Sequence, residues 1–168
     1  TSSPVPPAGV TDANAGGEPC LKHMNILAHS MGNRVLRHAV GKWVSDYGPL
    51  SGLFRNIFMA AADVADDTLD REHAGSMIAD AARNLVVYHA ADDFALRTSK
   101  IVNLRNKVVS RRLGHAGPRD MGRVPQNVVS VDCNDFNGLY DRLGHSYFLA
   151  APDGQPGLLL RHMMAVMD

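Results

Sequence analysis

Short apolar runs alternate along this chain with longer amphipathic stretches. The apolar runs have the length and composition of strands buried in a parallel sheet, and they cover residues 24–28, 54–62, 84–90 and 127–133. Apolar residues spaced three to five apart predict a helix from Ser30 to near Tyr47. Further helices are expected over 94–104, over 66–83 with Asp66 and Asp67 near its N-terminus, and over 157–167 with Leu158, Leu159, Met163 and Val166 facing the sheet. Strands and helices that alternate in this way predict an α/β fold, with a parallel sheet, helices on both faces and right-handed crossovers.

The two non-periodic stretches have different compositions. Residues 1–19 are rich in Pro, Gly, Ala, Ser and Thr and cannot bury enough surface to offset the entropy of ordering them. We therefore expect a flexible arm over residues 1–21 and a partial α/β domain over 22–168. Residues 108–126 mix Arg, Gly and Pro, which predicts a long surface loop, and this loop is the one candidate for a lid.

Composition excludes several classes of function. The chain has 168 residues, of which 45% are hydrophobic, enough for one domain with a core of its own. Lys plus Arg and Asp plus Glu number 17 each, so no net field attracts nucleic acid or an anionic membrane surface. No apolar run reaches the roughly 20 residues that span a bilayer, and no signal-peptide pattern is present, which favours the cytoplasm. The cysteines, Cys20 and Cys133, have no zinc-ligand spacing, so we expect neither metal nor cofactor.

A tight turn between the first strand and the first helix carries the most specific chemical signal. Ala28-His29-Ser30-Met31-Gly32 matches the nucleophile-elbow pattern G-x-S-x-G, with alanine in the first glycine position. We expect small residues at Ala28 and Gly32 because larger side chains would collide with the neighbouring backbone at this corner. The backbone N–H of Met31, at the start of the helix, is suitably placed to bind an oxyanion.

Candidate partners for Ser30 follow the later strands. A serine nucleophile needs an imidazole base and a carboxylate that orients it, and α/β hydrolases supply them in the order serine, acid, histidine. Asp92 and Asp93 both follow the third strand, and spacing alone does not separate them. Asp63 is an alternative acid, or instead the cap of the helix expected from Asp66. His145 is the favoured base because it follows the last strand beside Gly144, and the alternative is His115, which is flanked by glycines but precedes that strand.

Five segments together resemble a bacterial α/β-hydrolase family that is related to lipases and esterases and whose function is largely unknown. The segments are LAHSMGNRVL (27–36), NIFMAAADV (56–64), VVYHAADDFAL (86–96), RRLGHAG (111–117) and GHSYF (144–148). The resemblance implies that Asp93 is the acid and His145 the base of a triad that cleaves a small carboxylic ester through an acyl-enzyme.

The resemblance covers only the second half of such a fold. Family members have further strands before the elbow and a second oxyanion donor in a loop there, and residues 1–22 resemble neither. We therefore expect weak turnover, or alternatively an inactive interaction module. In the parent strand order residues 24–28 would become an exposed edge, so we also expect a homo-oligomer or a partner chain that covers it.

Overall fold

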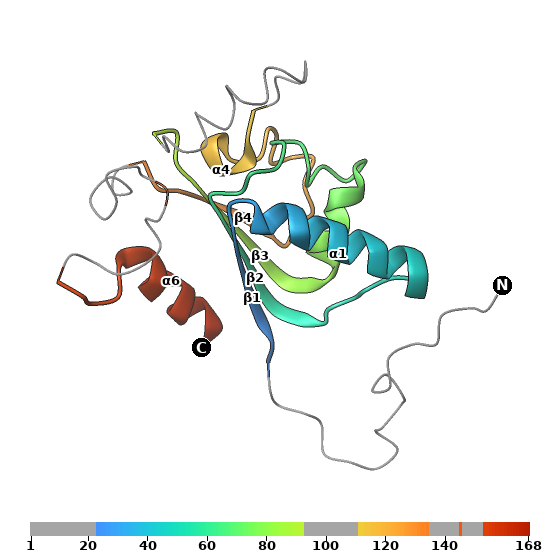
Figure 1. The fold of residues 1–168 in the computed structure, drawn as a ribbon, viewed down its shortest axis with the longest axis horizontal. Helices are drawn as coiled ribbons and strands as arrows, with labels where there is room; N and C mark the ends of the chain where they lie inside the picture. Colours follow the sequence, from blue (N-terminus) through green and yellow to red (C-terminus); the bar gives the residue numbers. More distant parts are fainter. Residues whose placement is uncertain (1–22, 93–110, 135–144, 146–152) are drawn as a thin grey trace, which may run out of the picture.

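The structure, a computed structural model, describes residues 23–92, 111–134, 145 and 153–168. Its centre is a four-stranded sheet in the order β1-β2-β3-β4, in which every neighbouring pair is parallel (Figure 1). The strands are β1 (Asn25–His29), β2 (Phe54–Ala60), β3 (Ala82–His89) and β4 (Val128–Asp132). The helices are α1 (Gly32–Tyr47), the 3-10 turn η1 (Ala74–Ser76), α2 (Met77–Asp80), α4 (Leu113–Ala116) and α6 (Leu158–Met167). The four strand predictions and the α/β fold class are confirmed.

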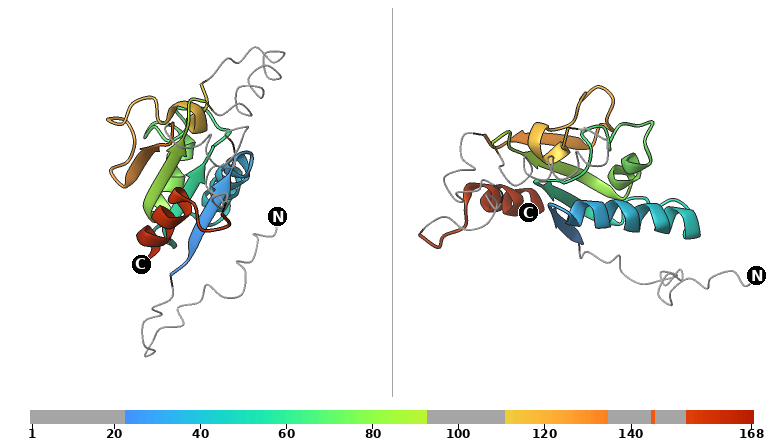
Figure 2. Two further views of the ribbon diagram at one scale, coloured as in Figure 1. Left: turned by 90° about the vertical axis from the view of Figure 1, so that its left-hand side faces the viewer. Right: turned by 45° about the horizontal axis from the view of Figure 1, so that its top comes forward.

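Helices cover both faces of the sheet, as expected (Figure 2). On one face, Leu36 and Val40 of α1 pack with Ile78 of α2 and Leu113 of α4 against the side chains of β2 and β3. On the other face, α6 packs through Leu159 and Met163, which contact a second buried cluster that includes Phe58, Val86 and Tyr88. Leu158, which we expected to face the sheet, is instead 46% exposed, because α6 begins at this residue and turns its next side chain inward.

A row of asparagines crosses three strands on the α6 face. Asn25, Asn56 and Asn84 are in register, and Asn84 Nδ2 donates to Asn56 Oδ1 at 2.9 Å while Asn56 Nδ2 donates to Asn25 Oδ1 at 2.8 Å. The row satisfies polar groups within the sheet, where Asn56 is fully buried. It ends at Asn25, because β1 is an edge strand.

The prediction of one long helix over 66–83 is wrong. Only η1 and α2 are helical there, and residues 82–83 already belong to β3. Asp66 and Asp67, which we expected near the helix N-terminus, instead both pair with Arg119, at 2.7 and 3.2 Å, and Asp70 pairs with Arg123 at 3.1 Å. These long-range ion pairs hold 65–73 as a folded turn that the local helix propensity does not predict.

The described part of the predicted lid, residues 111–126, is bound to the domain body. It contains α4, its Leu113 and Val124 are buried, and Ala65 forms an antiparallel bridge with Arg112. Packing of this kind is unlike that of a free surface loop. The expected helix over 94–104 and the expected arm over 1–21 lie outside the described residues.

Candidate active site

Ser30 occupies the corner between β1 and α1. Its φ of 51° lies in the left-handed region, where few residues other than glycine are found, and such strain is concentrated at functional sites. The Ser30 N–H donates to Ala60 O at 3.0 Å, and its carbonyl accepts from the N–H groups of Asn33 and Asp63 at 3.1 and 3.2 Å. The backbone on both sides of Ser30 is thereby fixed, while its side chain makes no hydrogen bond to the described residues.

The two small positions of the elbow differ in their surroundings. Ala28 is 6% exposed and packs in the core beneath α1. A Cβ added to Gly32 would meet none of the described atoms within 4 Å. The expectation that a larger residue would collide with the backbone there is therefore wrong for the described part of the chain. The left-handed turn is taken by Ser30 itself, and this leaves Gly32 in ordinary helical backbone at the start of α1.

Asn33 holds the corner together, and our sequence analysis missed it. Its side chain is fully buried, and its Nδ2 donates to the carbonyl oxygens of Ala28 and Ser30 at 3.1 Å each and of Ala60 at 3.4 Å. It therefore ties the end of β1, the serine and the end of β2 to one amide. The sequence does contain a signal for this role, because a polar residue three positions after the serine falls on the sheet-facing side of the predicted helix and must find buried partners there.

Asp63, the alternative acid, lies at the end of β2 between two arginines. Its Oδ2 is 2.8 Å from Arg34 on α1, its Oδ1 is 3.1 Å from Arg112, and its carbonyl accepts from Arg34 Nε at 2.8 Å. These contacts occupy the carboxylate and join α1 to the segment that leads into α4. Such a cross-link favours a structural role for Asp63.

The histidine favoured as base lies beside the elbow. His145 is half-buried, its carbonyl oxygen is 3.1 Å from His29 Nε2, and the two ring centroids are 4.6 Å apart. Because His29 precedes the serine, this contact brings the segment that carries His145 to the corner. It joins two parts of the chain that lie 116 residues apart.

The alternative base, His115, lies on α4 near the end of β3. Burial lowers the pKa of the neighbouring His89. Asp132 raises this pKa, and the charge of His115 lowers it by a smaller amount. The acids that follow β3 are partly described: Asp92 is exposed, whereas Asp93 lies outside the described residues.

A family comparison fits this arrangement of strand, serine corner and helix. The model of a family described as α/β hydrolases of unknown function (DUF900) matches residues 16–161. The chain belongs to this α/β-hydrolase family. No curated protein and no solved structure matches the chain significantly.

Met31, the predicted oxyanion donor, lies between the serine and the first helix. The residue precedes α1, its carbonyl accepts the N–H groups of Arg34 and Val35, and its own N–H has no acceptor among the described residues. A free N–H at the start of a sixteen-residue helix is a suitable donor to a developing negative charge.

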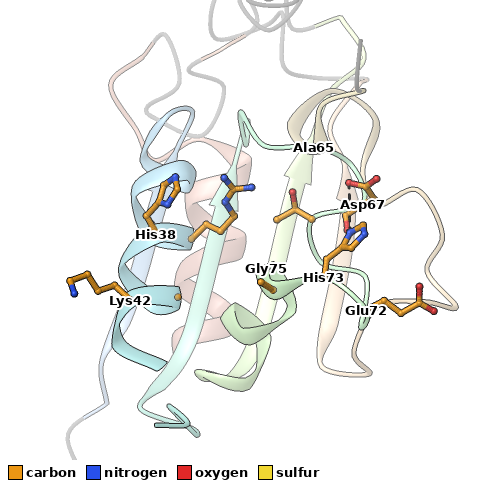
Figure 3. Close-up of a pocket in the computed structure, with 11 residues that line it drawn as sticks. His38, Lys42, Ala65, Asp67, Glu72, His73 and Gly75 are labelled. Carbon is orange, nitrogen blue, oxygen red and sulfur yellow. Dashed lines mark hydrogen bonds and ion pairs between the residues drawn. The ribbon is translucent and has the colours of Figure 1, made fainter. Parts of the chain in front are cut away.

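A groove of about 730 Å³ lies on another side of α1 (Figure 3). His38 and Lys42 line the groove from α1, and Asp67, Glu72 and His73 line it from the segment over 65–75. Neither Ser30 nor His145 is among the described residues that line it, so the groove is separate from the elbow. Within the described ranges there is no cluster of three side chains fit to hold a metal ion, and no helix is long and apolar enough to cross a membrane.

Proposed function

We propose that this chain is a serine hydrolase that cleaves small carboxylic esters. The observation that carries the proposal is the left-handed conformation of Ser30 at the junction of β1 and α1. Ser30 is half-buried at the carboxyl edge of the sheet, where the carbonyl oxygen of an attacked ester could also reach the Met31 N–H.

The proposed reaction has two steps. Ser30 Oγ attacks the ester carbonyl while His145 takes its proton, and the tetrahedral oxyanion accepts a hydrogen bond from the Met31 N–H. His145 then gives the proton to the departing alcohol, which leaves an acyl group on Ser30. Water attacks the acyl group with His145 again as base, and the carboxylic acid and free serine result.

An aspartate after β3 orients the histidine in this proposal. Asp93 is our choice, and Asp92 is the alternative, because a carboxylate must accept the second ring N–H of the base. The contact between His145 and His29 supports the role of His145 as base, since His29 directly precedes Ser30 in the sequence. A single oxyanion donor predicts slow turnover, since loss of one donor costs about 10²- to 10³-fold.

Hydrolysis of p-nitrophenyl acetate tests the proposal. Ser30→Ala and His145→Ala should reduce the rate to that of buffer, whereas Ser45→Ala, an exposed serine on α1, should leave it unchanged. Asp93→Asn should lower the rate by at least about 10²-fold and Asp92→Asn should have little effect. Equal rates for the Ser30→Ala and unmodified proteins would refute the mechanism, and loss in His115→Ala rather than His145→Ala would reassign the base.

A second candidate function is a catalytically inactive interaction module. Within the described residues β1 pairs with a strand on one side only, and this supports the candidate, because a homo-oligomer or a partner chain could add a strand on the other side. Absence of any Ser30-dependent hydrolysis would favour this candidate.

A further inference from the structure

The groove between α1 and the segment over 65–75 is a second concave site, apart from the serine corner. Its described lining lies between Arg37 and Gly75, after β1 and before β3. Figure 3 shows side chains of α1 along one wall and side chains of the 65–75 segment along the other. Its volume of about 730 Å³ falls in the range of clefts that bind small organic molecules.

Arg37 carries the one formal charge of this lining that has no ion-pair partner among the described residues. The other charged side chains of the lining are all paired: Lys42 with Asp46 at 2.7 Å, Asp67 with Arg119 at 3.2 Å, and Glu72 with Arg123 at 2.7 Å. A guanidinium presents its N–H donors in a fixed fork that matches the two oxygens of a carboxylate. The unpaired charge therefore favours an anionic ligand.

Gly41 leaves the α1 wall open next to Arg37. It follows Arg37 by four residues and lies on the same side of the helix, in the interior of α1, where glycine is less stabilising than alanine. Outside the adjacent helix backbone, an added Cβ would meet none of the described atoms within 4 Å, so packing in the described chain does not require glycine. The missing side chain leaves space beside the guanidinium that a bound molecule can fill.

The opposite wall limits the charge of the ligand. The carboxylates of Asp67 and Glu72 line it, and they repel a doubly charged phosphate more strongly than a singly charged carboxylate. Ala65 and Ala74 add apolar surface to the same wall. Thr68 is 5% exposed, and its hydroxyl makes no hydrogen bond with the described residues. This wall therefore favours a ligand with one negative charge and an apolar body.

We propose that the groove binds a small organic acid. The carboxylate of the acid pairs with Arg37, and its apolar part occupies the space beside Gly41 and contacts Ala65 and Ala74. The Thr68 hydroxyl is available to a second polar group of the ligand. Neither Ser30 nor His145 takes part, so the binding proposal can fail while the hydrolase proposal stands.

Hexanoate is a suitable probe because it has one carboxylate and a short hydrocarbon chain. In a heteronuclear NMR titration of the full chain at neutral pH and constant ionic strength, hexanoate should shift the Gly41 and Thr68 amides to saturation. Hexanol, which lacks the charge, and inorganic phosphate, which lacks the chain, should each bind at least about tenfold more weakly. No shift of these amides at tens of millimolar hexanoate, or equal or tighter binding of hexanol or phosphate, would overturn the proposal.

Two substitutions on α1 test the charge and the space separately. Arg37→Gln should raise the dissociation constant of hexanoate by at least about tenfold, and Arg37→Lys should restore part of the affinity. Gly41→Leu should abolish binding without lowering the melting temperature, because leucine has the higher helix propensity. Ala39→Leu adds the same side chain outside the groove lining and should leave the affinity unchanged. Unchanged affinity in Arg37→Gln or Gly41→Leu, or equal losses in the two leucine variants, would contradict the site.

A third variant separates this groove from the serine corner, where a carboxylic acid would also be the product of the proposed reaction. Ser30→Ala should bind hexanoate as tightly as the unmodified chain, whatever its rate of ester hydrolysis. Shifts confined to the Ser30 and Met31 amides of the unmodified chain, and unaffected by Arg37→Gln, would place the acid at the corner and overturn the proposal.

Discussion

A single buried amide determines the geometry of the serine corner. Asn33 donates to three carbonyl oxygens from β1, the corner and β2, and Ser30 keeps its left-handed backbone within that arrangement. The neighbouring ion pairs of Asp63 with Arg34 and Arg112 fix the end of β2 from the other side. The corner is therefore held by side chains that do not take part in the proposed chemistry.

Asn33→Ala should destabilise the protein by about 1–3 kcal/mol. The substitution removes a buried donor that three carbonyl oxygens share, of which those of Ser30 and Ala60 keep backbone donors, and the loss of buried hydrogen bonds worth about 0.5–1.5 kcal/mol each falls in that range. Urea denaturation followed by circular dichroism measures the change, with Ser45→Ala as a control on the exposed side of the same helix. A change in unfolding free energy no larger than that of the control would show that the amide is dispensable.

Gly32 and Gly114, two of the glycines in the family motifs, should respond differently to alanine. At Gly114 an added Cβ would lie 2.1 Å from Ala62 N and 2.2 Å from Ala61 C, both backbone atoms, so the loop or the strand end must shift. We expect a loss of about 1–3 kcal/mol, as for other overpacked sites. At Gly32 there is room, and alanine in a helix should be neutral or stabilise the protein by about 0.5–1 kcal/mol. Thermal melts of the two variants measure this contrast, and a Gly32→Ala protein as unstable as Gly114→Ala would contradict it.

At the scale of elements, α6 closes the second face of the sheet over buried titratable groups. The Tyr88 hydroxyl is 2.8 Å from His162 Nδ1 on α6, and Cys133 lies in the same cluster. Burial raises the pKa of the Cys133 thiol to about 12, with a smaller contribution from Asp132, and burial likewise raises the pKa of Tyr88. Both groups are held in their neutral forms beneath the helix.

Alkaline pH should therefore weaken the fold. An unfolded thiol ionises near a pKa of about 8.5, whereas the folded thiol keeps its proton to about 12, so the folded state binds more protons between these values and stability falls as pH rises. In a Cys20→Ser background, the free energy of unfolding should drop from pH 8 to pH 10, and Cys133→Ala should reduce that slope. A slope identical in both proteins would contradict a buried, protonated thiol.

Local sequence patterns predicted the sheet better than the connections. The strands were predictable because buried parallel strands are short apolar runs, and α1 because Leu36, Val40 and Val44 repeat at helical spacing. The segment 66–83 was not, because its aspartates pair with arginines some fifty residues later, and a local pattern carries no information about such partners. The same limit applies to Asn33, whose role depends on the carbonyl of Ala60 on the next strand.

At the scale of the whole molecule, the described chain brings the serine corner and His145 to one edge of a parallel sheet and leaves β1 free at its side. The family was predictable from the sequence. The triad of Ser30, an acid and His145 stays a prediction, and its favoured acid, Asp93, lies outside the described residues.

The most direct test of the central claim is reaction with a fluorophosphonate probe, followed by mass mapping of the labelled peptide. A fluorophosphonate modifies a serine only where a base activates the hydroxyl. We predict one adduct per chain on Ser30, slowed strongly in His145→Ala and absent in Ser30→Ala. Labelling that persists in Ser30→Ala, or no labelling of the unmodified folded protein, would contradict the account.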